Sequence, residues 1–417
     1  MNIIITLLNY VQKQNNLSVS EQKRIIDSMP EPKDDFDRAF YNYLCNSKGQ
    51  NATVKGLFDL LCNIAIPFFL LVYLKNRIVI WCDKKRNVFE HHDALVIFAG
   101  NRAGKTYSYN GICPHEIWQI YKDVKILKLD VFPEYFEGVF TISAFGVWFC
   151  FVKKHPLKGF INLKCLVNLM GLNHLILKYS PKAIVNSRAE GNSISSIISL
   201  FCESNGTDYI NFMHGEMFAN IITAFVRFTK FYIWDEYYCK VFAWSRCLQD
   251  QFVVYTPDMY FDAINEEIEP IYFLTYVFTG DEFKRNAGKD GNAEAVKNIL
   301  LQFDRCGLKC KVRPHPRWSD LTYITTVFAN TGIVVENPHE IGVKESIFLS
   351  EKIVGDFSTM LTQAYYLHRD VILDDVTKPG LINELESMMY IMLHKPHELL
   401  SDVLSDVCSE YLIKLDD

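Results

Sequence analysis

The chain has 417 residues, of which 49% are hydrophobic, so it is long and apolar enough for two or three domains with ordinary cores. Its 43 Lys and Arg are outnumbered by 49 Asp and Glu, and the net charge of −6 makes nucleic acid an unexpected partner. The twelve cysteines include no Cys-x-x-Cys pair, which argues against zinc and for free thiols in a reducing compartment.

Residues 1–77 are predicted to form a helical segment without chemistry of its own. Ser18-x-x-Glu21 resembles a capping box, and no secretory signal is evident in the first residues. The apolar run from Leu60 to Leu74 contains Pro67 and is shorter than the roughly 20 residues that a membrane-spanning helix needs. We therefore favour a core element in a cytoplasmic protein, with peripheral contact to the inner membrane face left open.

From residue 78 onward, short apolar runs alternate with polar loops. The strand-like runs are Ile78–Trp81, Ala94–Phe98, Lys125–Leu129, Ala183–Val185 and Tyr209–Phe212. A helical period over Ser193–Glu203 separates the last two runs, and this order predicts a parallel sheet with right-handed crossovers. We therefore predict a first Rossmann-like domain over residues 78–255.

Two loops at predicted strand ends of this domain contain candidate residues. His214 directly follows a strand, and an imidazole with a pKa of about 6.5 is suited to take a proton from an acceptor hydroxyl. Glu216 would orient this ring or act in its place. The upstream polar turn with Arg188, Glu190 and Asn192 is suited to hold an acceptor. Both loops also fit structural roles, as a sheet-edge histidine and as a helix N-cap.

A rival site lies at residues 99–106. This stretch contains Gly104-Lys105-Thr106 and matches a relaxed Walker A pattern, with Ala where the first Gly normally stands. Gly111 and Pro114 interrupt the helix that should follow, and the apolar run before Asp130 contains a lysine where a Walker B strand is expected. We favour a glycine-rich turn over NTP hydrolysis.

A polar, acidic stretch over residues 256–270 is predicted to link this domain to a second Rossmann-like domain over residues 271–417. The expected elements of the second domain are strands at Ile271–Phe278, Lys309–Val312 and Val371–Leu373, and helices at Glu294–Phe303, Leu381–Met392 and His397–Leu415. Asp281 is a spare acid after the first of these strands.

Two loops of the second domain suggest a phosphate site. In a parallel sheet the carboxyl ends of the strands line one crevice, so side chains of both loops would project into one cleft. The first loop contains Arg313, His315, Pro316 and Arg317, and the second contains Asp356, Ser358 and Thr359. A helical pattern from Leu361 places the two hydroxyls at the N-cap or first turn, where helices bind anions. Arginine forks, an imidazole and hydroxyls suit a departing nucleotide phosphate without any metal.

These motifs resemble those of GT-B glycosyltransferases that build bacterial surface polysaccharides. Arg313-Pro314-His315-Pro316, Val354-Gly355-Asp356-Phe357-Ser358-Thr359 and His214-Gly215 are similar to motifs of the metal-independent sialyltransferases and polysialyltransferases, and of the CDP-glycerol glycerophosphotransferases. The likeness spans about residues 180 to 375. It implies an α/β GT-B fold in which two Rossmann-like domains face each other across a cleft.

The resemblance also implies an inverting, metal-independent transferase that moves sialic acid or a related keto-sugar from a CMP-activated donor to a capsule or lipopolysaccharide acceptor. His315, Ser358 and Thr359 would contact the donor phosphate, and His214 would be the base, although Thr359 stands where a second Ser is commoner. The choice of base stays open between His214, Glu216, Asp130 and Asp281. The alternatives are a CDP-glycerol-type polyol-phosphate transferase, a P-loop NTP-binding protein, and a scaffold with an inactive site.

Overall fold

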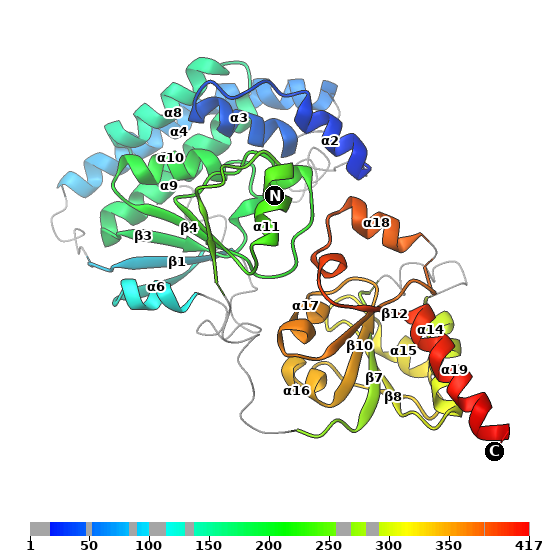
Figure 1. Ribbon diagram of the computed structural model, residues 1–417. Helices are drawn as coiled ribbons and strands as arrows, with labels where there is room; N and C mark the ends of the chain where they lie inside the picture. Colours follow the sequence, from blue (N-terminus) through cyan, green and yellow to red (C-terminus); the bar gives the residue numbers. More distant parts are fainter. Residues whose placement is uncertain are drawn as a thin grey trace. The chain divides into compact units, whose positions relative to one another are not determined.

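The computed structural model describes residues 17–46, 52–82, 90–99, 114–129, 137–255, 268–280, 292–378 and 380–416. The chain divides into two compact units, each with its own sheet (Figure 1). Unit 1 comprises Met1–His214 and Ala219–Pro257, and unit 2 comprises Gly215–Phe218 and Asp258–Asp417. The predicted pair of Rossmann-like domains is therefore confirmed, and the short segment after His214 packs with the second of them.

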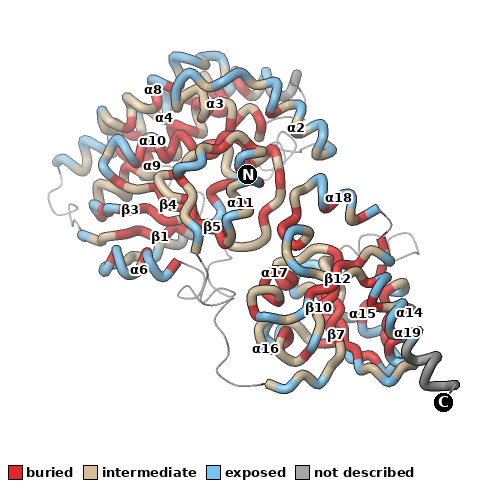
Figure 2. Tube along the Cα trace, viewed as in Figure 1, coloured by how far each residue is buried: buried red, intermediate tan, exposed pale blue. Residues whose placement is uncertain are grey.

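The sheet of unit 1 has six strands in the order β2-β1-β3-β4-β5-β6, and all their pairings are parallel. The strands are β1 (Ala94–Ala99), β2 (Val124–Leu129), β3 (Ala183–Asn186), β4 (Asp208–Phe212), β5 (Lys230–Ile233) and β6 (Phe252–Val254). The first four coincide with runs predicted from the sequence. The central strands are buried, as expected when helices cover both faces of a parallel sheet (Figure 2).

The helices of unit 1 form layers on this sheet. They are α2 (Val19–Asp27), α3 (Asp35–Asn46), α4 (Ala52–Cys82), α6 (His115–Ile120), α8 (Ile142–Lys154), α9 (Gly159–Tyr179), α10 (Ser195–Ser204) and α11 (Tyr237–Trp244), with 3-10 turns η2 (Ala189–Gly191) and η3 (Ile221–Thr223). Helix α10 lies on the sheet, α9 and α8 pack beside it, and α4 lies on the outside of α9 (Figure 1).

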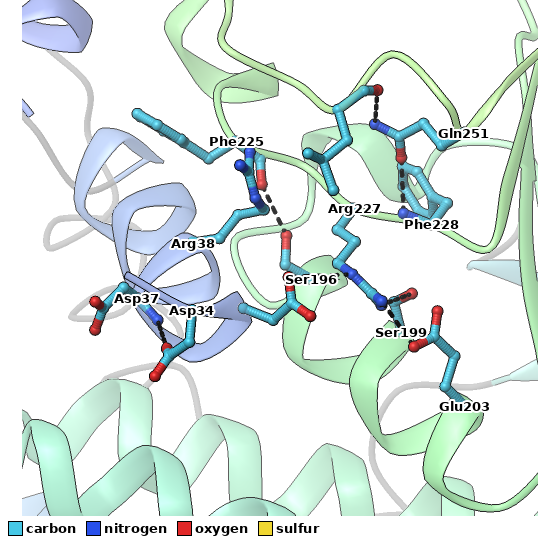
Figure 3. A network of polar contacts seen from close by, with 12 residues as sticks. Asp34, Asp37, Arg38, Ser196, Ser199, Glu203, Phe225, Arg227, Phe228 and Gln251 are labelled. Atoms are coloured by element: carbon cyan, nitrogen blue, oxygen red, sulfur yellow. Dashed lines mark hydrogen bonds and ion pairs between the residues drawn. The ribbon is translucent and has the colours of Figure 1, made fainter. Parts of the chain in front are cut away.

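The N-terminal helices α2 and α3 belong to unit 1 rather than forming a separate layer. The predicted capping box is confirmed, because the Ser18 side chain accepts from Glu21 N and the Glu21 side chain accepts from Ser18 N. Ile26 packs in a buried cluster with Ile221 and Phe225. The loop that receives these helices is held by polar contacts, among them the Ser196 hydroxyl donating to the Phe225 carbonyl at 3.1 Å (Figure 3).

Two predictions for the end of the N-terminal segment are wrong. Residues Ile78–Trp81, predicted as a strand, are the last turn of α4, which continues through Pro67. The run Leu60–Leu74, predicted as a core element, buries only one face of that helix and exposes the other. A β-branched run and an apolar run without charges indicate burial in general, but they do not show whether a neighbouring element covers both faces.

The sheet of unit 2 has the order β12-β11-β10-β7-β8-β9, again with parallel pairings throughout. The strands are β7 (Tyr272–Val277), β8 (Cys310–Arg313), β9 (Val334–Val335), β10 (Ser350–Gly355), β11 (Asp370–Leu373) and β12 (Glu398–Leu399). The helices are α14 (Asn292–Arg305), α15 (Leu321–Val327), α16 (Val343–Phe348), α17 (Thr359–Tyr366), α18 (Leu381–Ser387) and α19 (Leu400–Asp416), with the 3-10 turn η5 (Ile391–His394).

The core of unit 2 positions the two motif loops. Helices α14, α15 and α19 and strands β7, β8, β10 and β11 contribute buried apolar residues to one cluster. Because β8 and β10 flank β7 in a parallel sheet, the loops that follow β8 and β10 emerge at the same edge. Two strand spacings separate them, which is about 10 Å.

Candidate functional site

In unit 2, the His-Pro loop fixes the ring of His315. The Nδ1 atom accepts hydrogen bonds from the backbone N–H groups of Arg317, at 3.1 Å, and Trp318, at 3.2 Å. The His315 N–H donates to the Ser319 hydroxyl at 2.8 Å. Burial, with a smaller effect of the Arg317 charge, lowers the pKa of His315 to about 4. The ring is therefore neutral at pH 7, and because Nδ1 accepts, its proton lies on Nε2 as a hydrogen-bond donor.

Ser358 and Thr359 begin helix α17, as predicted. The Ser358 hydroxyl is the N-cap and accepts from the Met360 N–H at 3.1 Å. The Thr359 hydroxyl oxygen accepts from the Glu216 N–H at 3.1 Å. Each hydroxyl accepts one of these bonds and keeps its own hydrogen for donation. At the start of a helix, these two hydroxyl hydrogens are donors suited to an anion.

Gly280 follows β7 and packs against Trp318 in the His-Pro loop. Its backbone is in the left-handed region at φ +91°, and a Cβ atom at this position would lie only 2.2 Å from the Cβ of Trp318. Both the conformation and the close approach require glycine. The loop after β7 is thereby held against the loop after β8, on the side of the sheet where β10 also ends.

Two residues expected at the phosphate site are instead buried in ion pairs. The guanidinium of Arg313 pairs with Glu336 and donates to the Ile341 carbonyl at 3.0 Å, and Lys311 pairs with the same carboxylate. Asp356 pairs with Lys378. Arg313 is the last residue of β8, and its buried side chain binds residues that follow β9. These charges stabilise the bases of the two loops, while Pro316 and Arg317 are exposed beyond them.

In unit 1, the carboxylate beside His214 belongs to Glu190. The Oε1 atom of Glu190 lies 3.7 Å from the Nδ1 atom of His214. Asn211, near the end of β4, holds the other carboxylate oxygen at 2.8 Å through its amide nitrogen, and its amide oxygen accepts from the Ala189 N–H at 3.0 Å. The loops after the adjacent strands β3 and β4 thus bring an acid and an imidazole together at one sheet edge.

Glu190 is almost fully buried, with 5% of its surface exposed. Burial raises its pKa to about 7, although the Asn211 amide favours the ionised form. Buried carboxylates with shifted pKa values beside an imidazole are typical of proton-transfer sites. Glu190, which we expected at the acceptor, has its carboxylate beside His214 and Asn211.

The backbone before His214 is fixed by two aromatic side chains that the sequence analysis missed. The Trp234 indole donates to the Tyr255 hydroxyl at 3.1 Å, and this hydroxyl donates to the Met213 carbonyl at 3.3 Å. Both follow the ends of strands in the same sheet, β5 and β6.

Glu216, which we expected to orient His214 or to act in its place, binds the start of α17. Its carboxylate accepts from the buried Thr362 hydroxyl at 2.6 Å, within unit 2. Phe218, in the same short segment, packs on the rings of Phe357 and Tyr390 at centroid distances of 5.8 and 5.7 Å. The segment Gly215–Phe218 therefore fixes the start of α17.

The remaining predicted residues are placed as follows. Arg188 is exposed, and the Asn192 side chain accepts from the Ile194 N–H at 3.4 Å, as expected for a turn before a helix. Asp130, Asp281 and the motif Gly104-Lys105-Thr106 lie outside the described residues. Within the described ranges, no group of three or more His, Cys, Asp or Glu side chains is placed to hold a metal ion.

No protein-family model matches the sequence, and no curated protein matches it. Among solved structures, the wall teichoic acid polymerase TagF is similar at 11% identity over 88% of this chain and 92% of that chain, with a TM-score of 0.41. The UDP-GlcNAc 2-epimerase of Methanocaldococcus jannaschii is 13% identical over 71% and 92% of the two chains, with a TM-score of 0.40. The lipopolysaccharide outer core galactosyltransferase WaaB is 10% identical over 76% and 94%, with a TM-score of 0.38. These likenesses are too loose to assign an activity.

Proposed function

We propose that this protein is an inverting, metal-independent glycosyltransferase that uses a nucleotide-activated sugar. The observation that supports this most is the set of neutral donors at one edge of the unit 2 sheet, formed by His315, Ser358 and Thr359. The reaction also needs a base that removes the proton of the acceptor hydroxyl, and we assign this role to the Glu190–His214 pair of unit 1.

On the donor side, the leaving group is a nucleotide phosphate. As the bond between the anomeric carbon and the phosphate oxygen breaks, the electron pair stays on that oxygen and negative charge grows there. The Nε2–H of His315 and the hydroxyls of Ser358 and Thr359 donate hydrogen bonds to this charge. A ring with a pKa of about 4 does not protonate the phosphate at neutral pH, so His315 acts by hydrogen bonding rather than as a general acid.

On the acceptor side, His214 removes the proton of the attacking hydroxyl through Nε2. The acceptor oxygen then forms the new bond to the anomeric carbon, on the face opposite the departing phosphate, and the configuration inverts. The positive charge that arrives on the ring is stabilised by the ionised Glu190 beside Nδ1. Glu190 is a positioning residue in this scheme, because it acts through His214.

The donor is proposed to be CMP-linked sialic acid or a related keto-sugar, and the acceptor a capsule or lipopolysaccharide glycan. A CDP-glycerol-type donor is the alternative, since transfer from it also releases a cytidine phosphate. We propose that neither reaction needs a metal and that the enzyme works in the cytoplasm. The ten described cysteines are all free thiols, in keeping with a reducing compartment.

The test is slow hydrolysis of a panel of nucleotide donors by the full chain, with and without EDTA. We expect hydrolysis of a CMP-sugar that EDTA leaves unchanged and that His315→Ala lowers by about 100-fold or more. Hydrolysis of CDP-glycerol alone would establish the alternative donor. Full activity of His315→Ala, or complete dependence on a divalent metal, would contradict the proposed chemistry.

A further inference from the structure

Helix α4 is attached to unit 1 along one face. The buried residues on this face are Asp59, Cys62, Ile66 and Tyr73, at the spacing of one helical stripe. The Asp59 carboxylate accepts from the Phe160 N–H at 2.8 Å. One or two turns before its end, the helix is held again, because the Asn76 amide donates to the Gly138 carbonyl at 2.9 Å.

These contacts make α4 lie along α9 rather than project from the unit. Asp59 and Tyr73 are 14 positions apart, which corresponds to about 20 Å of helix. A Cβ atom on Gly159 would lie 1.8 Å from the Asp59 carbonyl oxygen, so the two helices meet where α9 begins with glycine. Both α4 and α9 are long and apolar enough to cross a membrane by length and composition, but α4 uses its polar residues to bind its own unit.

The opposite face of α4 is apolar and exposed. Seven large apolar side chains on this face expose more than half of their surface, namely Leu57, Leu60, Leu61, Ile64, Phe68, Leu71 and Ile78. An apolar patch of this extent on a soluble surface marks an interaction site. On neighbouring helix α8, Ile142 and Phe149 are exposed as well, at 86% and 51%.

The exposed charges of this helix are basic. Within Ala52–Cys82 the only acidic residue is Asp59, which is buried. Lys75 and Arg77 are exposed near the end of the helix, Lys75 on the apolar side and Arg77 on the side of the buried stripe. Trp81 lies at the same end, and tryptophan prefers the boundary between lipid and water.

We infer that the exposed face of α4 binds the surface of an anionic lipid bilayer, with the helix lying in the plane of the interface. Apolar side chains would enter the acyl boundary, and the basic residues would meet acidic headgroups. A second copy of the chain is the other occupant that such a face could take, and the experiment below separates the two. This inference does not depend on the transferase proposal.

Flotation of the full chain with lipid vesicles tests this inference. We expect binding to phosphatidylcholine vesicles that contain phosphatidylglycerol, and at least about tenfold less binding to phosphatidylcholine alone. The variant Ile64→Glu, Phe68→Glu, Leu71→Glu should lose binding by a similar factor, and it should stay folded because these positions are exposed.

A matched control places the same charges on exposed apolar positions elsewhere in unit 1, namely Ile120→Glu, Ile126→Glu and Val254→Glu. This control should float like the unmodified chain, and an alkaline carbonate wash should release both proteins. No flotation of the unmodified chain, equal flotation of the α4 variant, or resistance to the wash would overturn the inference. Dimerisation that the α4 variant abolishes, without vesicle binding, would assign the face to a second copy.

Discussion

His315 contributes to the proposed site as a neutral ring whose orientation the backbone fixes. Two backbone N–H groups bind Nδ1, so only Nε2 is left to face a ligand. This arrangement explains why a histidine serves here, since an arginine or lysine would add a permanent charge and lacks an acceptor for the two N–H groups. The sequence motif indicated this residue but not its protonation state, and the phosphate role stays a prediction.

We expect His315→Asn to retain more function than His315→Ala. An asparagine side chain is short but still offers an acceptor to the loop and a donor to the ligand, whereas alanine offers neither. Donor affinity of both variants, measured by calorimetry, should fall in the order unmodified, Asn, Ala. The variant His339→Ala, at an exposed histidine of the same unit, should match the unmodified chain.

Glu190 predicts a pH dependence of stability. Its folded pKa of about 7 lies above the ordinary value of 4.5, so between these values the folded state holds a proton that the unfolded state has released. Stability should therefore fall as pH rises from about 4.5 to 7, by on the order of 3 kcal/mol. In Glu190→Gln this loss should disappear in urea unfolding at pH 5 and pH 8, while Glu116→Gln, at an exposed acid, should keep it.

The same residue predicts a pH dependence of activity. Glu190 stabilises the protonated ring of His214 only when it is ionised, so kcat/KM should rise through pH 7. Glu190→Gln should lower kcat/KM by about 100-fold and flatten this profile. A variant that loses only stability and keeps the profile would show that Glu190 is structural.

At the scale of single elements, glycine substitutions test the close backbone contacts that position the loops of the site. Gly280→Ala combines a strained backbone, which costs about 1–2 kcal/mol, with a clash against Trp318, which costs about 1–3 kcal/mol. Gly307 has a similar positive φ but open space around it, so Gly307→Ala should cost only the first amount. Equal losses in thermal unfolding of the two variants would show that the Gly280–Trp318 contact is unimportant.

The packing of α4 on α9 can be tested with a second matched pair of glycine variants. Gly159→Ala would push against the Asp59 carbonyl and should cost about 1–3 kcal/mol, because backbone cannot move aside easily. Gly146→Ala in α8 meets nothing within 4 Å and should stabilise by about 0.5–1 kcal/mol. Thermal unfolding checks both signs, and stabilisation by Gly159→Ala would contradict the described packing of α4 on α9.

Sequence patterns predicted the elements with long apolar runs and missed those defined by tertiary contacts. The strands β6, β9 and β12 have only two or three residues, so their sequences show no repeating apolar pattern. Only their pairing within the sheet defines them. Residues Ile78–Trp81 have strand-like composition, yet they continue a helix whose other face packs on α9. Proximity along the chain likewise suggested Glu216 as the partner of His214, whereas the adjacent strands β3 and β4 provide Glu190.

For the whole molecule, the alternation of strands and helices was enough to predict two Rossmann-like units, because parallel sheets need crossover helices. The predicted linker over residues 256–270 begins next to Pro257, where the second segment of unit 1 ends, and Gly215–Phe218 belongs to unit 2. Sequence patterns gave no sign that this segment packs with unit 2. Its placement depends on two hydrogen bonds, one from the Glu216 N–H to the Thr359 hydroxyl and one from the Thr362 hydroxyl to the Glu216 carboxylate. The N-terminal segment, predicted as an appendage, is part of unit 1.

The central claim is that His315 and the hydroxyls at the start of α17 bind one phosphate. A double-mutant cycle tests it most directly, with CMP affinity measured by calorimetry for His315→Ala, Ser358→Ala and the double variant. Thr141→Ala removes the N-cap of α8 in unit 1 and controls for the loss of a helix cap alone.

We predict that each single variant weakens CMP binding by about tenfold or more and that the double variant loses less than the product of the two, since both groups bind the same phosphate. Thr141→Ala should bind CMP like the unmodified chain. Unchanged affinity in both single variants would contradict the account.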